Sequence, residues 1–264
     1  MSIHSTARIH PSSIVADTAV IGARCIVGPF CTIGANVELA EDCELVSHVV
    51  VDGHTRLGAR NKIFPFAGVG VAPQDLKYQG EPTRLEIGDR NVIREYVTIS
   101  RGTNGGGGIT RIGSDCLVMA CAHIGHDSQI GSHCILANAA TLAGHVTVED
   151  YATVGALCPV HQYCRIGRYA YVGGGTVIVQ DVLPFSLTSA KRDTHAFGLN
   201  RVGLQRRGFS SEQMRDLHHA YKALHSAKLN TTQAVEKLKA EEGASEDVRY
   251  LIEFIESSTR GVLK

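Results

Sequence analysis

The sequence predicts a mainly β protein, a parallel β-helix of hexapeptide repeats with a C-terminal α-helical domain. An aliphatic residue recurs at every sixth position, and a helical period replaces this one only near the C-terminus. A helix repeats every 3.6 residues and a simple strand every two, so neither explains a period of six. The first run of repeats has these aliphatic residues: Ile9, Val15, Ile21, Val27, Ile33, Leu39, Leu45, Val51, Leu57, Ile63 and Val69. The second run has Ile112, Val118, Ile124, Ile130, Leu136, Leu142, Val148, Val154, Val160, Ile166, Val172 and Ile178.

Each hexapeptide supplies one short strand and one corner of a triangular coil. The aliphatic side chain points inward, and a small residue after it, as in Ile124-Gly125, lets the backbone turn. Three hexapeptides complete a coil, so every third hexapeptide should stack on its predecessor, with coils about 4.8 Å apart.

Two polar segments interrupt the repeat, and we expect them to leave the β-helix as external loops at about 72–85 and 100–111. In the first, Asp75 and Glu81 stand where aliphatic residues belong, and the repeat resumes at Ile87, one whole coil after Val69. The second contains four consecutive glycines, which cannot pack a core and predict a mobile loop. Loops on a rigid scaffold commonly carry function, although tolerated insertions would give the same pattern.

The repeat ends near Ile178, which predicts a β-helix over 1–184 and a helical domain over 185–264, with a plain connector as far as Gly208. Ser210 and Gln213 resemble a capping box at the start of a first helix. Thr231 or Thr232 marks the start of a second helix, and Ser245 that of a third. Three helices here would cover the last open coil of the β-helix.

Composition excludes several classes of protein. The formal net charge is zero, which argues against a dedicated nucleic-acid binder, and no apolar run is long enough to predict a membrane span. The first residues lack the pattern of a secretory signal, so we expect a cytoplasmic location. The eight cysteines include pairs one hexapeptide apart, such as Cys25 and Cys31, and no Cys-x-x-Cys pair. They are typical of small buried repeat residues rather than of disulfides or a thiolate zinc site.

Stacking gathers four histidines at one edge of successive coils, because Ile124, Leu142 and Val160 occupy equivalent places in three consecutive coils. His126, Gly144 and Gln162 share one offset in the repeat and should form a column. The histidines are His123, His126, His145 and His161.

Two chemistries compete at this edge. Three histidines can hold zinc, but the sequence intervals between these four include no His-x4-His pair, which argues against a metal. A neutral histidine can instead act as a general base near pH 7. Asp127 would orient the ring of His126, and the N–H of Gly144 would stabilise a tetrahedral oxyanion. A base and an oxyanion donor without a serine or cysteine nucleophile imply direct acyl transfer to a hydroxyl.

Arg206 and Arg207 stand side by side before Gly208. They could belong to a solvated helical face, or to a patch for phosphates or an acidic partner protein. Arginine forks suit phosphate oxygens, which makes this pair a candidate binding feature.

The hexapeptides and several further segments resemble the UDP-N-acetylglucosamine O-acyltransferases of lipid A synthesis, nearly from end to end. These segments are residues 74–78, 80–84, 122–127, 136–138, 142–145 and 206–210. The resemblance implies a left-handed β-helix and a cytoplasmic homotrimer with active sites between neighbouring subunits. It also implies transfer of a 3-hydroxyacyl chain from acyl carrier protein to the 3-hydroxyl of UDP-N-acetylglucosamine, the first step of lipid A biosynthesis. Neither a metal nor a cofactor is implied, because the phosphopantetheine thioester is a substrate.

By this resemblance His126 is the catalytic base, Asp127 its orienting partner and Gly144 the oxyanion donor. The resemblance assigns contacts of the sugar or the acyl group to His123, His145 and His161, and sugar-side contacts on the first loop to Asp75 and Lys77. It assigns contacts of the nucleotide to Gln162, Asn200, Arg206 and Arg207. Gly174 would leave the acyl groove open for a long chain. The sequence departs from the family at Ser100, where histidine is frequent, and at Val202, where an acidic residue is expected.

Two other functions deserve comparison. The N-acyltransferase two steps later in the same pathway carries an extra uridine-binding domain before its β-helix, and this chain has no room for one. A purely structural β-helix would explain the hexapeptides, but not the clustered histidines or the two polar loops.

Overall fold

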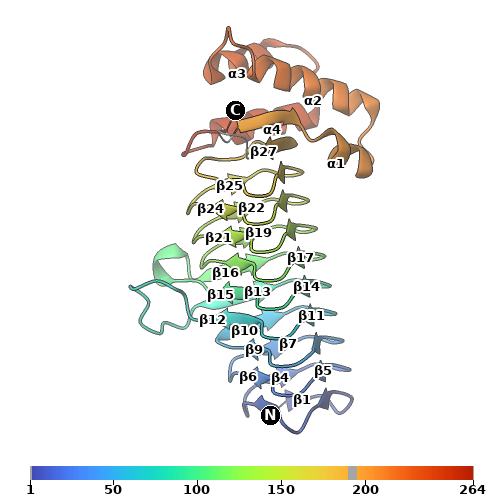
Figure 1. The fold of residues 1–264 in the computed structure, drawn as a ribbon, viewed down its shortest axis with the longest axis vertical. Coiled ribbons are helices and arrows are strands. Elements are labelled where there is room, and N and C mark those ends of the chain that lie inside the picture. Colours follow the sequence, from blue (N-terminus) through green and yellow to red (C-terminus); the bar gives the residue numbers. More distant parts are fainter. Residues whose placement is uncertain (1, 190–194, 264) are drawn as a thin grey trace.

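The structure, a computed structural model, describes residues 2–189 and 195–263. A left-handed parallel β-helix forms a triangular prism, and a helical domain covers its C-terminal end (Figure 1). The predicted fold class is therefore confirmed. Sheet A contains β1 (Ser2–Ile3), β4 (Val20–Ile21), β7 (Glu38–Leu39), β10 (His54–Leu57), β13 (Arg84–Ile87), β16 (Ile109–Ile112), β19 (Gln129–Ile130), β22 (Thr147–Val148) and β25 (Arg165–Ile166).

The other two faces of the prism are sheets B and C. Sheet B contains β2 (Arg8–Ile9), β5 (Ile26–Val27), β8 (Glu44–Leu45), β11 (Lys62–Ile63), β14 (Val92–Ile93), β17 (Leu117–Val118), β20 (Ile135–Leu136), β23 (Thr153–Val154), β26 (Tyr171–Val172), β27 (Ser186–Ser189) and β28 (His195–Leu199). Sheet C contains β3 (Ile14–Val15), β6 (Thr32–Ile33), β9 (Val50–Val51), β12 (Gly68–Val71), β15 (Thr98–Ser100), β18 (His123–Ile124), β21 (Thr141–Leu142) and β24 (Pro159–Val160).

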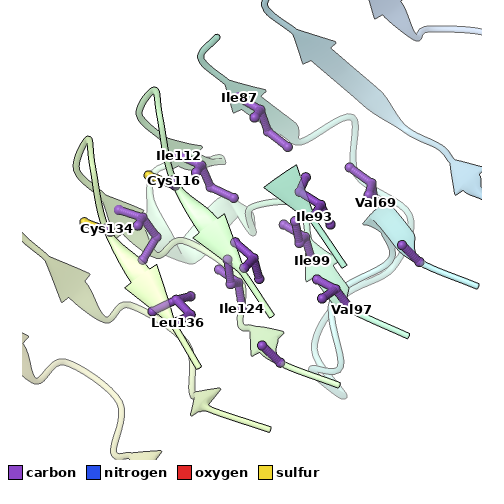
Figure 2. Close-up of a cluster of buried hydrophobic side chains, with 14 of the residues drawn as sticks. Val69, Ile87, Ile93, Val97, Ile99, Ile112, Cys116, Ile124, Cys134 and Leu136 are labelled. Carbon is purple, nitrogen blue, oxygen red and sulfur yellow. The ribbon is translucent and has the colours of Figure 1, made fainter. Parts of the chain in front are cut away.

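The strand register confirms that every third hexapeptide stacks on its predecessor. Ile124 pairs with Leu142, and Leu142 pairs with Val160. In most two-residue strands the second residue is the buried one, and it is the aliphatic residue that the period singles out. Figure 2 shows such side chains, among them Ile93, Ile112 and Ile124, pointing into a shared interior. Burying each such side chain contributes about 1.5–3 kcal/mol.

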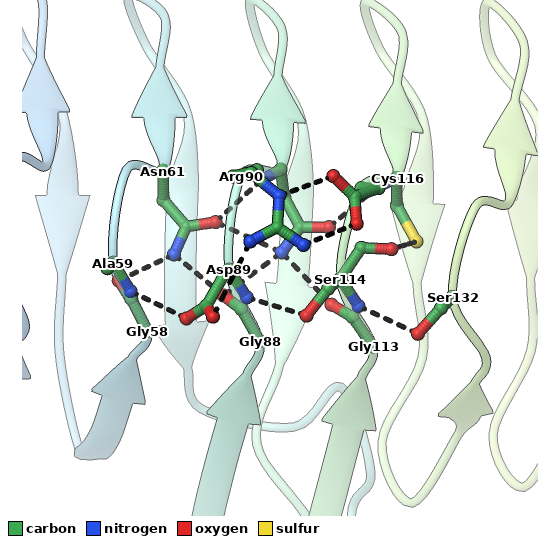
Figure 3. A network of polar contacts seen from close by, with 12 residues as sticks. Gly58, Ala59, Asn61, Gly88, Asp89, Arg90, Gly113, Ser114, Cys116 and Ser132 are labelled. Atoms are coloured by element: carbon green, nitrogen blue, oxygen red, sulfur yellow. Dashed lines mark hydrogen bonds and ion pairs between the residues drawn. The ribbon is translucent and has the colours of Figure 1, made fainter.

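One interior column, between sheets A and B, contains both thiols and carboxamides. Asn61 and Asn91 are fully buried there, on coils that follow Cys43 and precede Cys116. The amide of Asn61 donates to the carbonyls of Gly58 and Gly88, at 2.8 Å each, so its burial leaves no polar atom unsatisfied (Figure 3). All eight cysteines are free thiols, seven of them buried, as the repeat pattern predicts, and Cys121 is exposed.

The two predicted loops leave the prism at the same corner (Figure 1). Val69 pairs with Ile99, and Ile99 pairs with Ile124, so each of these two coils is longer than three hexapeptides. The prediction that Ile87 lies one whole coil after Val69 is wrong, because Ile87 stacks on Leu57 in sheet A. Both insertions follow a sheet C strand and precede a sheet A strand, and we call this corner the C–A edge. The glycine-rich insertion is more constrained than a mobile loop, because it contains the 3-10 turn η1 (Asn104–Gly106) and packs against Asp127.

Among the described residues, the C-terminal domain has four helices rather than the three predicted: α1 (Arg201–Arg206), α2 (Ser211–Leu224), α3 (Thr231–Ala240) and α4 (Glu246–Glu256). The capping box of Ser210 and Gln213 is confirmed, and α3 begins at Thr231. Ser245 is the N-cap of α4, but its side chain makes no capping hydrogen bond. No helix among the described residues is long and apolar enough to cross a membrane.

The prediction of a plain connector up to Gly208 is wrong. β27 pairs in parallel with β26, so sheet B continues beyond residue 184, and β28 pairs antiparallel with β27. Helix α1 follows directly, with Asn200 as its N-cap. A six-residue helix and a strand pair outside the hexapeptide phase carry no period that a sequence pattern can reveal.

Candidate active site

The C–A edge collects most of the predicted catalytic side chains on three successive coils. His126 and Asp127 lie in the turn after β18, and Gly144 and His145 lie in the turn after β21. His161 and Gln162 follow β24, where both are exposed. The two external loops leave this same edge on the two preceding coils, so one face of the molecule carries both loops and histidines.

His126 and Asp127 form a hydrogen-bonded pair although they are neighbours in sequence. Asp127 has a left-handed backbone, with φ of 60°, which turns its carboxylate back toward the ring. Nδ1 of His126 lies 2.8 Å from Oδ2 of Asp127. Since a carboxylate only accepts hydrogen bonds, Nδ1 carries the proton and Nε2 is the nitrogen that can accept one. The pair has the geometry of a base and its orienting partner.

The carboxylate of Asp127 is enclosed by residues that the sequence pattern missed. Its side chain has no exposed surface. The N–H of Thr103 donates to Oδ1 at 2.8 Å, and the hydroxyl of Thr103 donates to Oδ2 at 2.6 Å. The N–H of Asp127 itself donates to the hydroxyl of Thr110 at 2.8 Å. Thr103 lies in the glycine-rich insertion, outside the hexapeptide phase, so no periodic signal marks it.

Gly144 lies directly beside the ring of His126, as their shared offset in the repeat predicts. A Cβ placed on Gly144 would be 2.6 Å from both Cε1 and Nε2 of that ring, closer than any real Cβ contact. The N–H of Gly144 donates no hydrogen bond within the described part of the chain. A free backbone donor therefore lies next to the nitrogen that can accept a proton.

His123 and His145 flank this pair as neutral imidazoles. Burial lowers the pKa of His123, and the nearby His126 lowers it further. Burial also lowers the pKa of His145, against the opposing charge of Asp127. Nδ1 of His123 lies 2.8 Å from the hydroxyl of Thr98, and His145 stacks on the ring of Tyr163. Neutral imidazoles both donate and accept hydrogen bonds, which suits contacts with sugar hydroxyls.

The first external loop brings Asp75 toward the histidines. Burial lowers the pKa of His145, and the charge of Asp75 acts in the opposite direction. Arg101 holds the loop, because its Nε donates to the hydroxyl of Tyr78 and its guanidinium donates to the carbonyl of Gly70, both at 2.8 Å. Lys77 is exposed on the same loop, with its backbone N–H donating to the carboxylate of Asp75.

Comparison with known proteins identifies the family. Residues 181–263 match the family described as Udp N-acetylglucosamine O-acyltransferase, domain 2, and residues 1–35, 18–53 and 109–144 match the bacterial transferase hexapeptide repeat. The chain is 42% identical to the solved structure of LpxA from Acinetobacter baumannii, over 99% of each chain and with a TM-score of 0.80. This chain belongs to the UDP-N-acetylglucosamine O-acyltransferase family. As a member of that family it is an O-acyltransferase.

Two further members of this acyltransferase family are similar over nearly the whole chain. The UDP-N-acetylglucosamine acyltransferase of Francisella novicida is 38% identical, with a TM-score of 0.88, over 99% of this chain and 93% of that one. The enzyme of Campylobacter jejuni is 33% identical, with a TM-score of 0.91, over 97% and 99% of the two chains.

Four residues that the family resemblance assigns to substrate lie away from the histidines in a single chain. Gly174 lies in a turn between sheets B and C, and Asn200 caps α1 beside sheet B. The amide of Asn200 is engaged at both ends, since Oδ1 accepts from the N–H of Gly203 and Nδ2 donates to the carbonyl of Tyr169. Arg206 lines a groove of about 490 Å³ with Asn200, and Arg207 lies over the ring of Tyr151.

The two departures from the family pattern have different surroundings. Ser100 is buried at the end of β15, and Val202 is 61% exposed in the groove that Asn200 and Arg206 line. The residue at position 202 is therefore solvent-accessible in the same groove as Arg206, and because it is valine it offers that arginine no carboxylate.

His126, Asp127 and His145 also offer three potential metal ligands within 4.8 Å of one another. Both carboxylate oxygens of Asp127, however, already accept hydrogen bonds from Thr103. The ring of His126 donates to the same carboxylate. This arrangement matches the needs of acid–base chemistry better than those of a metal site.

Proposed function

We propose that the chain transfers a 3-hydroxyacyl group from acyl carrier protein to the 3-hydroxyl of UDP-N-acetylglucosamine, the first step of lipid A biosynthesis. The observation that carries the proposal is the His126–Asp127 pair with the free N–H of Gly144 beside it. The names of the similar acyltransferases support the choice of acceptor. A cytoplasmic location, which the family resemblance implies, is part of the same proposal.

In the proposed reaction, Nε2 of His126 takes the proton of the sugar hydroxyl as its oxygen attacks the thioester carbonyl. A C–O bond forms, and the negative charge moves to the former carbonyl oxygen, toward which the Gly144 N–H donates. Removing one such donor in other enzymes costs about 10²–10³ in rate. The intermediate then collapses with cleavage of the C–S bond, and the leaving thiolate takes the proton back from His126. The cycle balances without a cofactor, because the phosphopantetheine thioester is consumed as a substrate.

A basic groove on the helical domain supports a carrier protein as donor. This groove has a volume of about 780 Å³, and none of its lining residues is acidic. Its basic side chains are Arg201, Arg215, Lys222, His218 and His219. Such a surface is complementary to an acidic partner.

We further propose that the chain acts as a homotrimer with active sites between subunits. The residues assigned to substrate are divided in one chain between the C–A edge and the sheet B side, so a second copy is needed to complete one site. The outward positions of sheet C carry no Lys, Arg, Asp or Glu, whereas those of sheet A include Glu38, Arg56 and Arg111. On this face Ile14 is 69% and Val50 40% exposed, and a lack of charged residues is typical of a surface that packs on another protein.

This packing has a direct test. Sedimentation equilibrium at micromolar concentration should give a mass near three times the 28.3 kDa of one chain. A stable monomer with full activity would contradict the shared site.

The reaction itself is tested by product analysis. The enzyme is incubated with UDP-N-acetylglucosamine and, in turn, with acyl carrier proteins that carry different hydroxyacyl chains. Mass spectrometry should detect UDP-N-acetylglucosamine heavier by one 3-hydroxyacyl group, together with the free carrier thiol. If no donor in the panel gives this product, the proposed activity is wrong. His126→Ala serves as the control for uncatalysed transfer.

A further inference from the structure

The glycine-rich insertion is folded tightly onto Asp127. Thr103 is only 7% exposed and precedes η1. The turn is closed from within, since the N–H groups of Gly106 and Gly108 donate to the carbonyl of Thr103 at 3.0 and 2.8 Å. The preceding Gly102 is fixed to the body of the β-helix through the carbonyl of Arg84. This hydrogen bonding orients both donors of Thr103 toward the carboxylate.

Gly106 permits this contact because it has no side chain. A Cβ on Gly106 would lie 2.0 Å from Cγ and 2.1 Å from Oδ2 of Asp127, whereas a Cβ on the adjacent Gly105 would meet nothing within 4 Å. Neither glycine has a positive φ, so the two positions differ in space rather than in backbone strain. Alanine substitutions at Gly106 and Gly105 therefore form a matched test of the contact between the turn and Asp127.

Two imidazoles lie close enough to the Asp127 carboxylate to be its partner. Oδ2 of Asp127 is 2.8 Å from Nδ1 of His126, and it is also 3.9 Å from Nε2 of His145. Thr103 donates to both oxygens from the opposite side, which fixes the rotation of the carboxylate. In the described part of the chain, the titratable groups that face this carboxylate are thus His126 and His145. The charge of Asp75 acts on His145.

We propose that Thr103 is a positioning residue of this enzyme: its N–H and hydroxyl hold the Asp127 carboxylate toward His126 and away from His145, under a turn that requires glycine at position 106. The inference rests on the proposed role of His126 as the base. Both donors of Thr103 are directed to the Asp127 carboxylate, so in this proposal Thr103 acts through Asp127.

Thr103→Val and Thr103→Ser form the first test. Valine keeps the shape and the backbone donor but removes the hydroxyl, so kcat should fall about 10- to 100-fold, the usual effect of losing a hydrogen bond to a charged group. The KM of the nucleotide sugar should be nearly unchanged. The acid side of the pH–rate profile should move to higher pH, because Oδ2 attracts the ring proton more strongly without the hydroxyl. Serine restores the hydroxyl and should restore both kcat and the profile.

Gly106→Ala and Gly105→Ala form the second test, with thermal unfolding of each variant measured in parallel. Alanine at position 106 should lower kcat about 100-fold by displacing the carboxylate, and alanine at position 105 should leave kcat unchanged. A Thr103→Val enzyme with wild-type kcat and profile would overturn the inference, as would equal kcat values for the two alanine variants.

A readout independent of activity separates this inference from the proposed function. The Nδ1 proton of His126 should give a downfield NMR signal that moves in Thr103→Val and not in Thr103→Ser. If the wild type transfers no acyl group, the proposed function fails while this signal still tests the contact. If the wild type is active and Thr103→Val changes neither the NMR signal nor kcat, the proposed positioning role is wrong and the proposed function is unaffected.

Discussion

Substitution of Gly144 by alanine tests the geometry of the site with one methyl group. The new Cβ would lie 2.6 Å from Cε1 and Nε2 of His126, whereas ordinary contacts are 3.4–4 Å. The ring must therefore retreat by about 1 Å, and a displacement of that size can cost about 10²-fold in rate. This corresponds to about 2.7 kcal/mol of transition-state stabilisation. The backbone of Gly144 is free of positive φ, so alanine adds no strain of its own.

The assay measures kcat and KM for the nucleotide sugar in Gly144→Ala, together with the melting temperature. We expect kcat to fall about 10²-fold with the melting temperature nearly kept, because the His126 side chain is 17% exposed and can swing outward. Gly105→Ala, whose methyl group enters open space, is the matched control. Wild-type kcat in Gly144→Ala would refute the close approach of glycine and imidazole.

Three further predictions concern the rest of the site. Arg206→Ala combined with Arg207→Ala should raise the KM for the nucleotide sugar or the carrier protein strongly with folding intact; an unchanged KM for both would return the pair to an ordinary solvated surface. Gly174→Met should shift preference toward shorter acyl donors, and an unaltered preference would show that another residue limits the groove. His123 and His145 should titrate below the ordinary histidine value of about 6.5, since burial lowers the pKa of each. The folded state then binds fewer protons than the unfolded state, so stability is full above pH ~6.5 and is lost as pH falls through the two lowered pKa values. NMR titration with parallel melting curves checks this, and midpoints at or above the ordinary value for both rings would contradict it.

The hexapeptide period was sufficient to predict the prism and the histidine edge. Once three hexapeptides make a coil, the length of the coil places Gly144 beside His126 by arithmetic alone, and the structure confirms that contact. The period does not place the insertions, because Ile87 follows Val69 by one coil length in sequence but stacks on Leu57, and only the strand pairing shows that both insertions follow a sheet C strand. The inward aliphatic positions need no tertiary information, since the period of six marks them. A second position two residues earlier, as at Val37 and Cys43, is also buried.

The contacts made by the insertions could not be predicted in this way. Thr103 and Gly106 lie in a segment without period, and their roles depend on how the loop folds back onto Asp127. The strand pair β27–β28 and the short helix α1 were missed for a related reason, since tertiary pairing rather than local pattern forms them. Arg206 lies beyond the last hexapeptide, so the period of six could not predict that it lies away from the histidines.

The most direct test of the account is the effect of His126→Ala on kcat, measured beside the affinity for UDP-N-acetylglucosamine by calorimetry. A base that acts only in the chemical step should lower kcat by about 10² or more and leave that affinity nearly unchanged. His123→Ala, which removes a positioning contact, should cost less. A His126→Ala enzyme with near-normal kcat would contradict the assignment of His126 as the base, and with it the mechanism built on this edge.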